Sequence, residues 1–407
     1  MRATRVLEML LCLQGLKVVD VTMLPASREV VVDVETKKRR HFCPSCAFTT
    51  RARYDQSPAA RRWRHINLGV FRVWLQMRLS RLECPRHGVI TEAVPWAEHG
   101  SYFTHVFDEM VTWMARQMPK TTIERLAQIA WRTVGTILRR TVDRKLDDQR
   151  LEALVEIGID EVSYRKGHQY LSIIADHRSG DVVWAGEGKS AEAASVFFER
   201  LGPERCARIQ VVTMDMSAAF IKVVTEKCPK AQIAFDPFHV VKLANAAVDE
   251  VRREEVRLHQ GTAEGRTIKG TRWTLLKAPA KHSDADRLRL SEVARVNARL
   301  YRAYLFKEEL RALYRSAVDT AEIHLNSCLA WASRSRIPAL VKLGRTLRRH
   351  RDGILAAIRL GRSNGRLEGI NNKIGVLKHR SYGFHSAPSL IALVYLCCAD
   401  VPVNLPW

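Results

Sequence analysis

The sequence predicts an α+β protein of several domains, and three observations support this. The chain has 407 residues, more than one hydrophobic core usually serves. Its first hundred residues follow the two-residue period of strands, and strand and helix periods alternate from residue 153 to 240. Residues 240–360 are mostly helical in period. We expect domains at 1–100, 101–150, 151–244, 245–360 and 361–407.

Charge is distributed unevenly along the chain, whose formal net charge is +23. Residues 1–150 carry 26 Lys and Arg against 15 Asp and Glu, residues 151–244 carry 11 against 13, and residues 245–407 carry 29 against 15. Such an excess favours a polyanionic partner, either nucleic acid or an anionic membrane surface. No apolar run reaches the ~18 residues of a membrane span. The charge together with the motifs described below favours nucleic acid as the partner.

Residues 1–100 are expected to form a β-rich module around a metal site. Val30, Val32 and Val34 alternate with other residues, and residues 71–79 keep a strict period of two, which predicts a half-buried strand. Apart from the close pair Cys43 and Cys46, the cysteines mostly lie singly in apolar segments. That pattern indicates reduced thiols and a cytoplasmic protein rather than a disulfide framework.

Two pairs of soft ligands are each separated by two residues: Cys43 with Cys46, and Cys84 with His87. Such pairs suit tetrahedral Zn²⁺, because each tight turn presents two ligands. The 37 residues between the pairs predict a hairpin near 63–82. The alternative is a buried pair of cysteines beside an unrelated surface histidine. We predict one structural Zn²⁺ in a zinc-ribbon-like module.

Residues 101–150 predict a helix-turn-helix. Thr121 and Glu124 fit a capping box at the start of one helix, which ends near Ala130. A second helix after Trp131 has one apolar side, although generic helical hairpins share this pattern. Its other side offers these candidates for DNA contacts: Arg132, Thr133, Thr136, Arg139 and Arg140.

Residues 151–244 alternate strand and helix in a recognisable order. Three strands are predicted at 154–160, 168–176 and 181–188, followed by a helix at 190–201. A strand at 209–215, a helix at 217–228 and a strand at 231–236 complete the series. This is the order of a ribonuclease H-like core, and the helical, basic residues 245–360 would be an insertion into it.

Three acids predict a metal-dependent active site. Asp160 and Asp215 follow apolar strands, and Glu368 lies on the polar side of a helix predicted at 363–379. Carboxylates brought together repel each other, and cations relieve that cost. Two Mg²⁺ or Mn²⁺ ions would bridge a scissile phosphate there. The alternative interpretation is that these are solvated loop carboxylates.

Two further segments carry polar side chains whose roles stay open. Asp236 and His239 follow the fifth strand, and one interpretation is an accessory role that positions the metal site or the bound DNA. Asp236 also competes with Asp215 as a metal ligand. The alternative is that Asp236 caps the next helix and His239 forms a hydrogen bond within the core. In the insertion, the run 348–351 is strongly basic and predicts either DNA contact or a solvated face. The stretch 266–277 favours short extended pieces.

Several long segments resemble the transposases of the ISL-three insertion-sequence family. They are EIGIDEVSYRKGHQYLSIIAD, VTMDMSAAF, FDPFHVVKLAN, GTRW and SNGRLEGINNKIGVLKHRSYGFHS. The resemblance implies a DDE transposase whose catalytic acids are Asp160, Asp215 and Glu368, with an acid-x-x-His signature at Asp236 and His239. The family tends to have a fourth cysteine at the position of His87.

We therefore expect an enzyme that binds terminal inverted repeats through its N-terminal modules. It would hydrolyse a phosphodiester at the element end and join the freed 3′-hydroxyl to target DNA. A homo-oligomer on paired ends and association with the nucleoid are expected. The alternatives are a catalytically silent DNA-binding regulator and a ribonuclease H-like nuclease that cuts but does not join.

Overall fold

The chain folds into two compact units in a computed structural model that describes residues 3–11, 13, 15–37, 40–165, 167, 169–381, 384, 386–403 and 405. The first unit comprises Met1–Leu146 with Val401–Trp407, and the second comprises Asp147–Asp400. Among the described residues, no helix is both long and apolar enough to cross a membrane.

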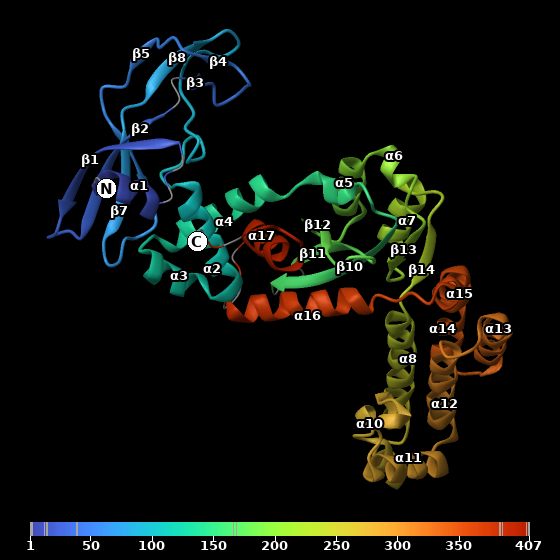
Figure 1. Ribbon diagram of the computed structural model, residues 1–407. Helices are drawn as coiled ribbons and strands as arrows, with labels where there is room; N and C mark the ends of the chain where they lie inside the picture. Colours follow the sequence, from blue (N-terminus) through green and yellow to red (C-terminus); the bar gives the residue numbers. More distant parts are fainter. Residues whose placement is uncertain are drawn as a thin grey trace. The chain divides into compact units, whose positions relative to one another are not determined.

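The first unit begins with α1 (Ala3–Leu10) and three small sheets (Figure 1). Their strands are β1 (Leu16–Leu24), β2 (Glu29–Thr36), β3 (His41–Phe42), β4 (Thr49–Thr50), β5 (Asp55–Gln56), β6 (Arg61–Arg64), β7 (Arg72–Met77), β8 (Ser80–Cys84) and β9 (Gly88–Thr91). The orders are β1-β2-β7-β6, β3-β4 and β5-β8-β9. The hairpin predicted near 63–82 exists as β6 and β7, and it belongs to the largest sheet.

Three helices complete this unit: α2 (His105–Gln117), α3 (Lys120–Ala127) and α4 (Trp131–Lys145). The predicted capping box at Thr121 is wrong, because α3 begins at Lys120 and its N-cap is Pro119, two residues before the predicted one. The carboxylate of Glu124 instead accepts a hydrogen bond from the backbone N of Trp131 at 3.2 Å. Glu124 therefore fixes the start of α4 rather than the start of its own helix.

The second unit is built on one five-stranded sheet with the order β12-β11-β10-β13-β14. Its strands are β10 (Glu156–Arg165), β11 (Gln169–Asp176), β12 (Val182–Glu187), β13 (Val211–Met214) and β14 (Gln232–Phe235). β10, β11 and β12 pair antiparallel, whereas β13 is parallel to both β10 and β14. The first strand continues beyond its predicted end, so Asp160 lies inside β10 and not after it.

Helices surround the five-stranded sheet (Figure 1). Near the sheet are η1 (Asp148–Leu151), α5 (Ala191–Leu201), α6 (Pro203–Cys206), α7 (Ala218–Lys227), α16 (Gly365–Arg380) and α17 (Ala387–Cys398). α16 packs on β10, and α17 packs on β12. As predicted, α16 buries four apolar side chains: Leu367, Ile370, Ile374 and Leu377.

The remaining helices form the long insertion between β14 and α16. They are α8 (Pro237–Leu258), α9 (Ala263–Ile268), α10 (Arg272–Leu276), η2 (Pro279–Lys281), α11 (Asp284–Val296), α12 (Ala298–Leu313), α13 (Val318–Arg334), α14 (Pro338–Arg349) and α15 (Arg351–Leu360). The prediction of short extended pieces at 266–277 is wrong, because α9 and α10 occupy this stretch. α15 packs on the edge strand β14, and one apolar core runs from the sheet into the insertion.

Candidate active site and metal centre

Three acids lie in one register across the parallel strands of the second unit. Gly158 pairs with Thr213, so Asp160 and Asp215 each lie two residues beyond a paired position. Met214 pairs with Phe235, so Asp215 and Asp236 each lie one residue beyond the next pair. The three carboxylates therefore leave neighbouring strands at the same level of the sheet.

The acids at this edge affect one another electrostatically. Burial raises the pKa of Asp160, and the Asp215 carboxylate adds to this rise, while the Glu161 backbone N–H and His239 oppose it. Burial also raises the pKa of Asp236, and Asp160 adds to that rise. Carboxylates that disfavour one another's charged form are the setting in which a bound cation is most stabilising.

Glu161 is an acid of this cluster that sequence reasoning missed. Burial raises its pKa to about 7, and the charges of Asp215 and Asp160 add to the rise. Its adjacency to Asp160 in the sequence was the available signal. Successive side chains of a strand point to opposite faces, however. The adjacency of Asp160 and Glu161 therefore does not by itself predict that both lie near Asp215.

Backbone and side-chain donors fix two of the carboxylates. Asp160 Oδ1 accepts from the backbone N of Glu161 at 2.8 Å, and its Oδ2 accepts from Asn371 Nδ2 at 2.6 Å. Asp215 Oδ1 accepts from the backbone N of Ser217 at 2.9 Å. Asn371 lies on α16, three residues after Glu368, so these two side chains share one helix face.

Glu368 is exposed in the first turn of α16. Among the described residues, its carboxylate has no hydrogen-bond or ion-pair partner, and no group of ligand atoms within 4.8 Å of one another combines it with Asp160 and Asp215. The structure thus brings Asp160 and Asp215 together and places Glu368 on the helix that contacts Asp160.

Asp236 and His239 belong to the same neighbourhood. Asp236 is 7% exposed and makes no capping hydrogen bond to α8, although it is the N-cap residue. Its Oδ1 accepts instead from the backbone N of Asn364 at 3.3 Å. His239 Nε2 lies 3.9 Å from Asp236 Oδ2, and the nearby imidazole lowers the pKa of both Asp160 and Asp236.

A close approach between β10 and α16 sets the position of this helix. A Cβ added at Gly158 would lie 2.4 Å from Leu367 Cδ1 and 3.0 Å from Thr213 Oγ1. Only glycine therefore allows the helix that carries Glu368 to lie this close to the strand that carries Asp160.

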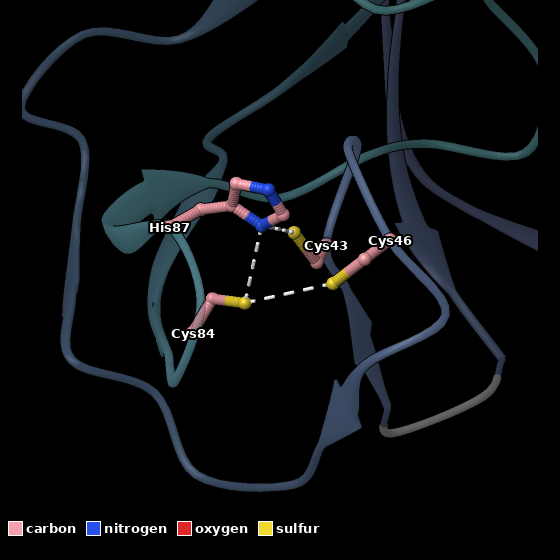
Figure 2. Close-up of side chains that lie close together, drawn as sticks. All are labelled: Cys43, Cys46, Cys84 and His87. Carbon is pink, nitrogen blue, oxygen red and sulfur yellow. Dashed lines mark hydrogen bonds between the residues drawn. The ribbon is translucent and has the colours of Figure 1, made fainter.

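The four predicted zinc ligands converge in the first unit (Figure 2). His87 Nδ1 lies 3.5 Å from Cys43 Sγ and 3.5 Å from Cys84 Sγ, and the Sγ atoms of Cys46 and Cys84 are 3.6 Å apart. Zn–S bonds of about 2.3 Å and a Zn–N bond of about 2.0 Å at tetrahedral angles give ligand separations of ~3.5–3.8 Å. The donor set and its spacing fit a zinc ion.

Local turns position these ligands. Cys43 and Cys46 lie in the turn between β3 and β4, and Cys84 and His87 lie at the turn between β8 and β9. Burial opposes ionisation of Cys84, but the backbone N–H of Arg86 and the His87 side chain lower its pKa to about 6. A thiolate is the form that binds zinc.

The helix-turn-helix presents the predicted polar face on α4. Arg132, Thr136 and Arg139 are exposed, and Thr133 is partly exposed in the first turn. Arg140 differs, because its Nη2 donates to Asp108 Oδ1 at 2.6 Å and its Nε donates to Asp108 Oδ2 at 3.0 Å. Asp108 is fully buried, so the Arg140 guanidinium is held within the domain.

Family models match the chain in the order of these modules. A zinc-finger model of IS204/IS1001/IS1096/IS1165 transposases matches residues 39–87, and a helix-turn-helix model of transposase family ISL3 matches residues 92–142. A transposase model of the DDE type from the same family matches residues 157–394.

Two named relatives extend the likeness over most of the chain. The transposase for insertion sequence element IS1557 of Mycobacterium tuberculosis is 37% identical over 378 residues, which cover 87% of this chain and 85% of the relative. The transposase for IS1001 of Bordetella parapertussis is 29% identical over 347 residues, which cover 84% and 85%. The chain therefore belongs to the ISL3 family of transposases and is a DNA-binding DDE transposase.

Proposed function

We propose that this transposase binds the terminal inverted repeats of an insertion sequence and cleaves and joins DNA with two divalent metal ions held by Asp160, Asp215 and Glu368. The observation that carries the proposal is the common register of Asp160 and Asp215 on adjacent strands, with the Glu368 helix in contact with Asp160. Asp236 and His239 act as accessory residues beside them.

We further propose that the second unit contains a ribonuclease H-like core. Its support is the element order of three strands, helix, strand, helix, strand, with the short α6 added after α5, and a central β10 that is antiparallel to β11 and parallel to β13. The proposed domains are 1–100, 101–150, 151–244, 245–360 and 361–407, the fourth being an insertion into this core.

The acids offer the oxygen ligands that Mg²⁺ and Mn²⁺ prefer. When bound, two such ions activate an attacking oxygen and stabilise the leaving oxygen of a phosphodiester. The chain's own part is to hold Asp160 and Asp215 in fixed orientations through Glu161, Asn371 and Ser217. Fixed ligands reduce the reorganisation that binding requires.

End recognition is assigned to the first unit. One structural Zn²⁺ at Cys43, Cys46, Cys84 and His87 would hold the two hairpins together, and α4 would enter the major groove. Base or phosphate contacts are proposed for Arg132, Thr133, Thr136 and Arg139, while Arg140 supports α4 through Asp108.

Basic residues of the insertion are proposed to contact DNA near the active site. Arg348 and Arg349 are exposed at the end of α14. Arg351 pairs with Glu322, and the His350 ring packs against Phe235, so these two side chains have partners within the fold. The proposed DNA contacts are therefore those of Arg348 and Arg349.

We also propose that a homo-oligomer holds the paired ends.

The test uses purified protein, Mg²⁺ and DNA carrying the repeats that flank its own gene. Cleaved ends and joined products are expected. A second substrate with pre-cleaved ends separates the steps, because a nuclease without strand transfer would leave these ends unjoined. A DNA-binding regulator would retain the ends without cleaving them, and that result would contradict the proposal.

A further inference from the structure

Two asparagine side chains fasten α16 to the sheet. Asn364, immediately before the helix, is 3% exposed, and its Nδ2 donates to Ile159 O at 3.2 Å. Its Oδ1 accepts from the Thr213 hydroxyl, and its backbone N donates to Asp236 Oδ1 at 3.3 Å. One residue at the start of α16 thus contacts β10, β13 and the acid after β14.

The second contact is made two turns further along by Asn371, which donates from Nδ2 to Asp160 Oδ2 at 2.6 Å. The orientation of this carboxamide follows from its partner, because a carboxylate accepts and only Nδ2 donates. Asp160 Oδ1 is held by the backbone N of Glu161. Each oxygen of Asp160 therefore has one hydrogen bond and keeps a lone pair for a cation.

The other end of the Asn371 carboxamide is not used within the fold. Its Oδ1 is buried and has no hydrogen-bond partner among the described residues. A buried unpaired acceptor is unfavourable, and uncharged carbonyl oxygens are good ligands or acceptors around Mg²⁺ and Mn²⁺. Asn372, the next residue, is exposed and provides a natural comparison.

We propose that Asn371 is a positioning residue of the metal centre, which orients the Asp160 carboxylate for cation binding and offers its free carbonyl oxygen at that centre. The inference rests on the proposed function, in which Asp160 holds a divalent ion. Glu368 lies between the two asparagine contacts, so the same docking of α16 that sets Asn371 on Asp160 also sets the position of the third acid.

The proposal predicts a loss of metal affinity that is specific to one of two adjacent asparagines. Residues that orient a metal ligand typically change metal affinity by about 10–100-fold when they are removed. Leu has the same branching of heavy atoms as Asn but neither donor nor acceptor, so Asn371→Leu removes the contact while keeping the branched shape of the side chain. Asn372→Leu is the matched control at an exposed position of the same helix turn.

The experiment measures Mn²⁺ binding by electron paramagnetic resonance on the full-length protein bound to pre-cleaved end DNA that lacks its 3′-hydroxyl, so that no joining occurs. We expect the Kd for Mn²⁺ to rise about 10–100-fold in Asn371→Leu and to stay unchanged in Asn372→Leu. In single-turnover cleavage of intact ends, the defect of Asn371→Leu should shrink as Mn²⁺ is raised, which general misfolding would not produce.

Circular dichroism in EDTA and metal-free end binding establish that each variant is folded, and Asn371→Ala replaces Asn371→Leu if the latter does not fold. Equal Mn²⁺ affinities in folded Asn371→Leu and Asn372→Leu would overturn the inference. Asp160→Asn distinguishes a failure of this inference from a failure of the proposed function. If Asp160→Asn binds Mn²⁺ as tightly as the wild type does, the proposed function itself fails.

Discussion

The zinc-ligand cluster and the carboxylate cluster are assembled to different degrees. The four zinc ligands all have ligand atoms within 4.8 Å of one another, whereas in the described part of the chain Asp160, Asp215 and Glu368 form no such group. The zinc ligands come from two short hairpins, each closed locally. Asp160 lies in β10, Asp215 lies directly after β13, and Glu368 lies on a helix 208 and 153 residues further along the chain, respectively.

This difference follows from charge and from sequence distance. Each tight turn presents two zinc ligands that are close in the sequence, so little of the chain has to be ordered to bring them together. Three carboxylates do repel, and their approach is most favourable when a cation is present. We therefore expect metal at the cysteines to control folding, and metal at the acids to control chemistry without changing the fold.

The largest effect is expected at the zinc site. Cys43→Ser should abolish zinc binding and unfold the β3–β4 and β8–β9 hairpins, because structural zinc contributes on the order of 10 kcal/mol to folding in small modules. Metal analysis and limited proteolysis measure this, with Ser45→Ala as the control in the same turn. Zinc-free wild-type protein would contradict the site, and normal zinc in His87→Ala would contradict the fourth ligand.

Loss of one of the three proposed catalytic acids should abolish activity and leave the fold intact, in contrast to loss of a zinc ligand. Asp160→Asn, Asp215→Asn and Glu368→Gln should each abolish cleavage and joining, because they remove an anionic ligand while keeping its size. End binding in EDTA and the unfolding transition should not change. Asp352→Asn, at an almost fully exposed acid of the same unit, is the control. Full activity in any of the three variants would remove that residue from the catalytic set.

Arg140→Ala should destabilise the first unit by about 3–5 kcal/mol, because it leaves the buried Asp108 carboxylate without its partner. Denaturant unfolding measures this loss. Asp108→Asn combined with Arg140→Gln should recover much of it, because neither remaining side chain then carries a buried charge. If Arg140→Ala instead weakens DNA binding at unchanged stability, Arg140 contacts DNA.

Low pH should destabilise the first unit through His65 as well as through the zinc ligands. Burial lowers the pKa of His65 from 6.5 to about 4, with Nε2 donating to Leu11 O. The unfolded chain therefore takes up a proton before the folded chain does, and about 3 kcal/mol of stability is lost as the pH falls from 6.5 to 4.

His65→Gln should flatten this part of the pH dependence of the unfolding free energy, measured in urea between pH 7 and 4. His99→Gln, at an exposed histidine, is the control. The remaining acid sensitivity would belong to the zinc ligands and to His105, whose pKa is also lowered by burial. An identical slope in His65→Gln and the wild type would show that His65 does not contribute.

Local patterns were readable from the sequence wherever period or spacing decided the outcome. The strands and helices from β10 to β14 appear in the predicted order, and the apolar face of α16 has the predicted residues. The pairing of Cys43 and Cys46 with Cys84 and His87 was visible from their spacing, because each pair lies within one turn.

Long-range contacts were not readable in this way. Nothing in the spacing of Asn364 shows that it reaches Ile159 and Thr213, because these residues meet only through the packing of α16 on Gly158. Thr121 is not a cap because α3 already begins at Lys120, and the carboxylate of Glu124 accepts a hydrogen bond from Trp131 instead. Arg140 shared the polar face of α4 by period, and only the burial of Asp108 distinguishes it from Arg139.

The smallest effect expected is at Arg139, and it tests whether α4 reads DNA. Its guanidinium is exposed, so Arg139→Ala should leave the unfolding free energy nearly unchanged, in contrast to Arg140→Ala. If Arg139 contacts a base, the variant should lose roughly 1–3 kcal/mol of end binding and discriminate less against random DNA. If it contacts a phosphate, all sequences should bind more weakly, and the log–log salt slope should flatten by about one. Binding isotherms in EDTA at several salt concentrations distinguish these outcomes, and a fragment of residues 1–150 should show the same preference without Mg²⁺. If that fragment does not prefer end DNA to random DNA at moderate salt, specificity lies elsewhere, and the exposed Arg348 and Arg349 of the insertion are the next side chains to replace.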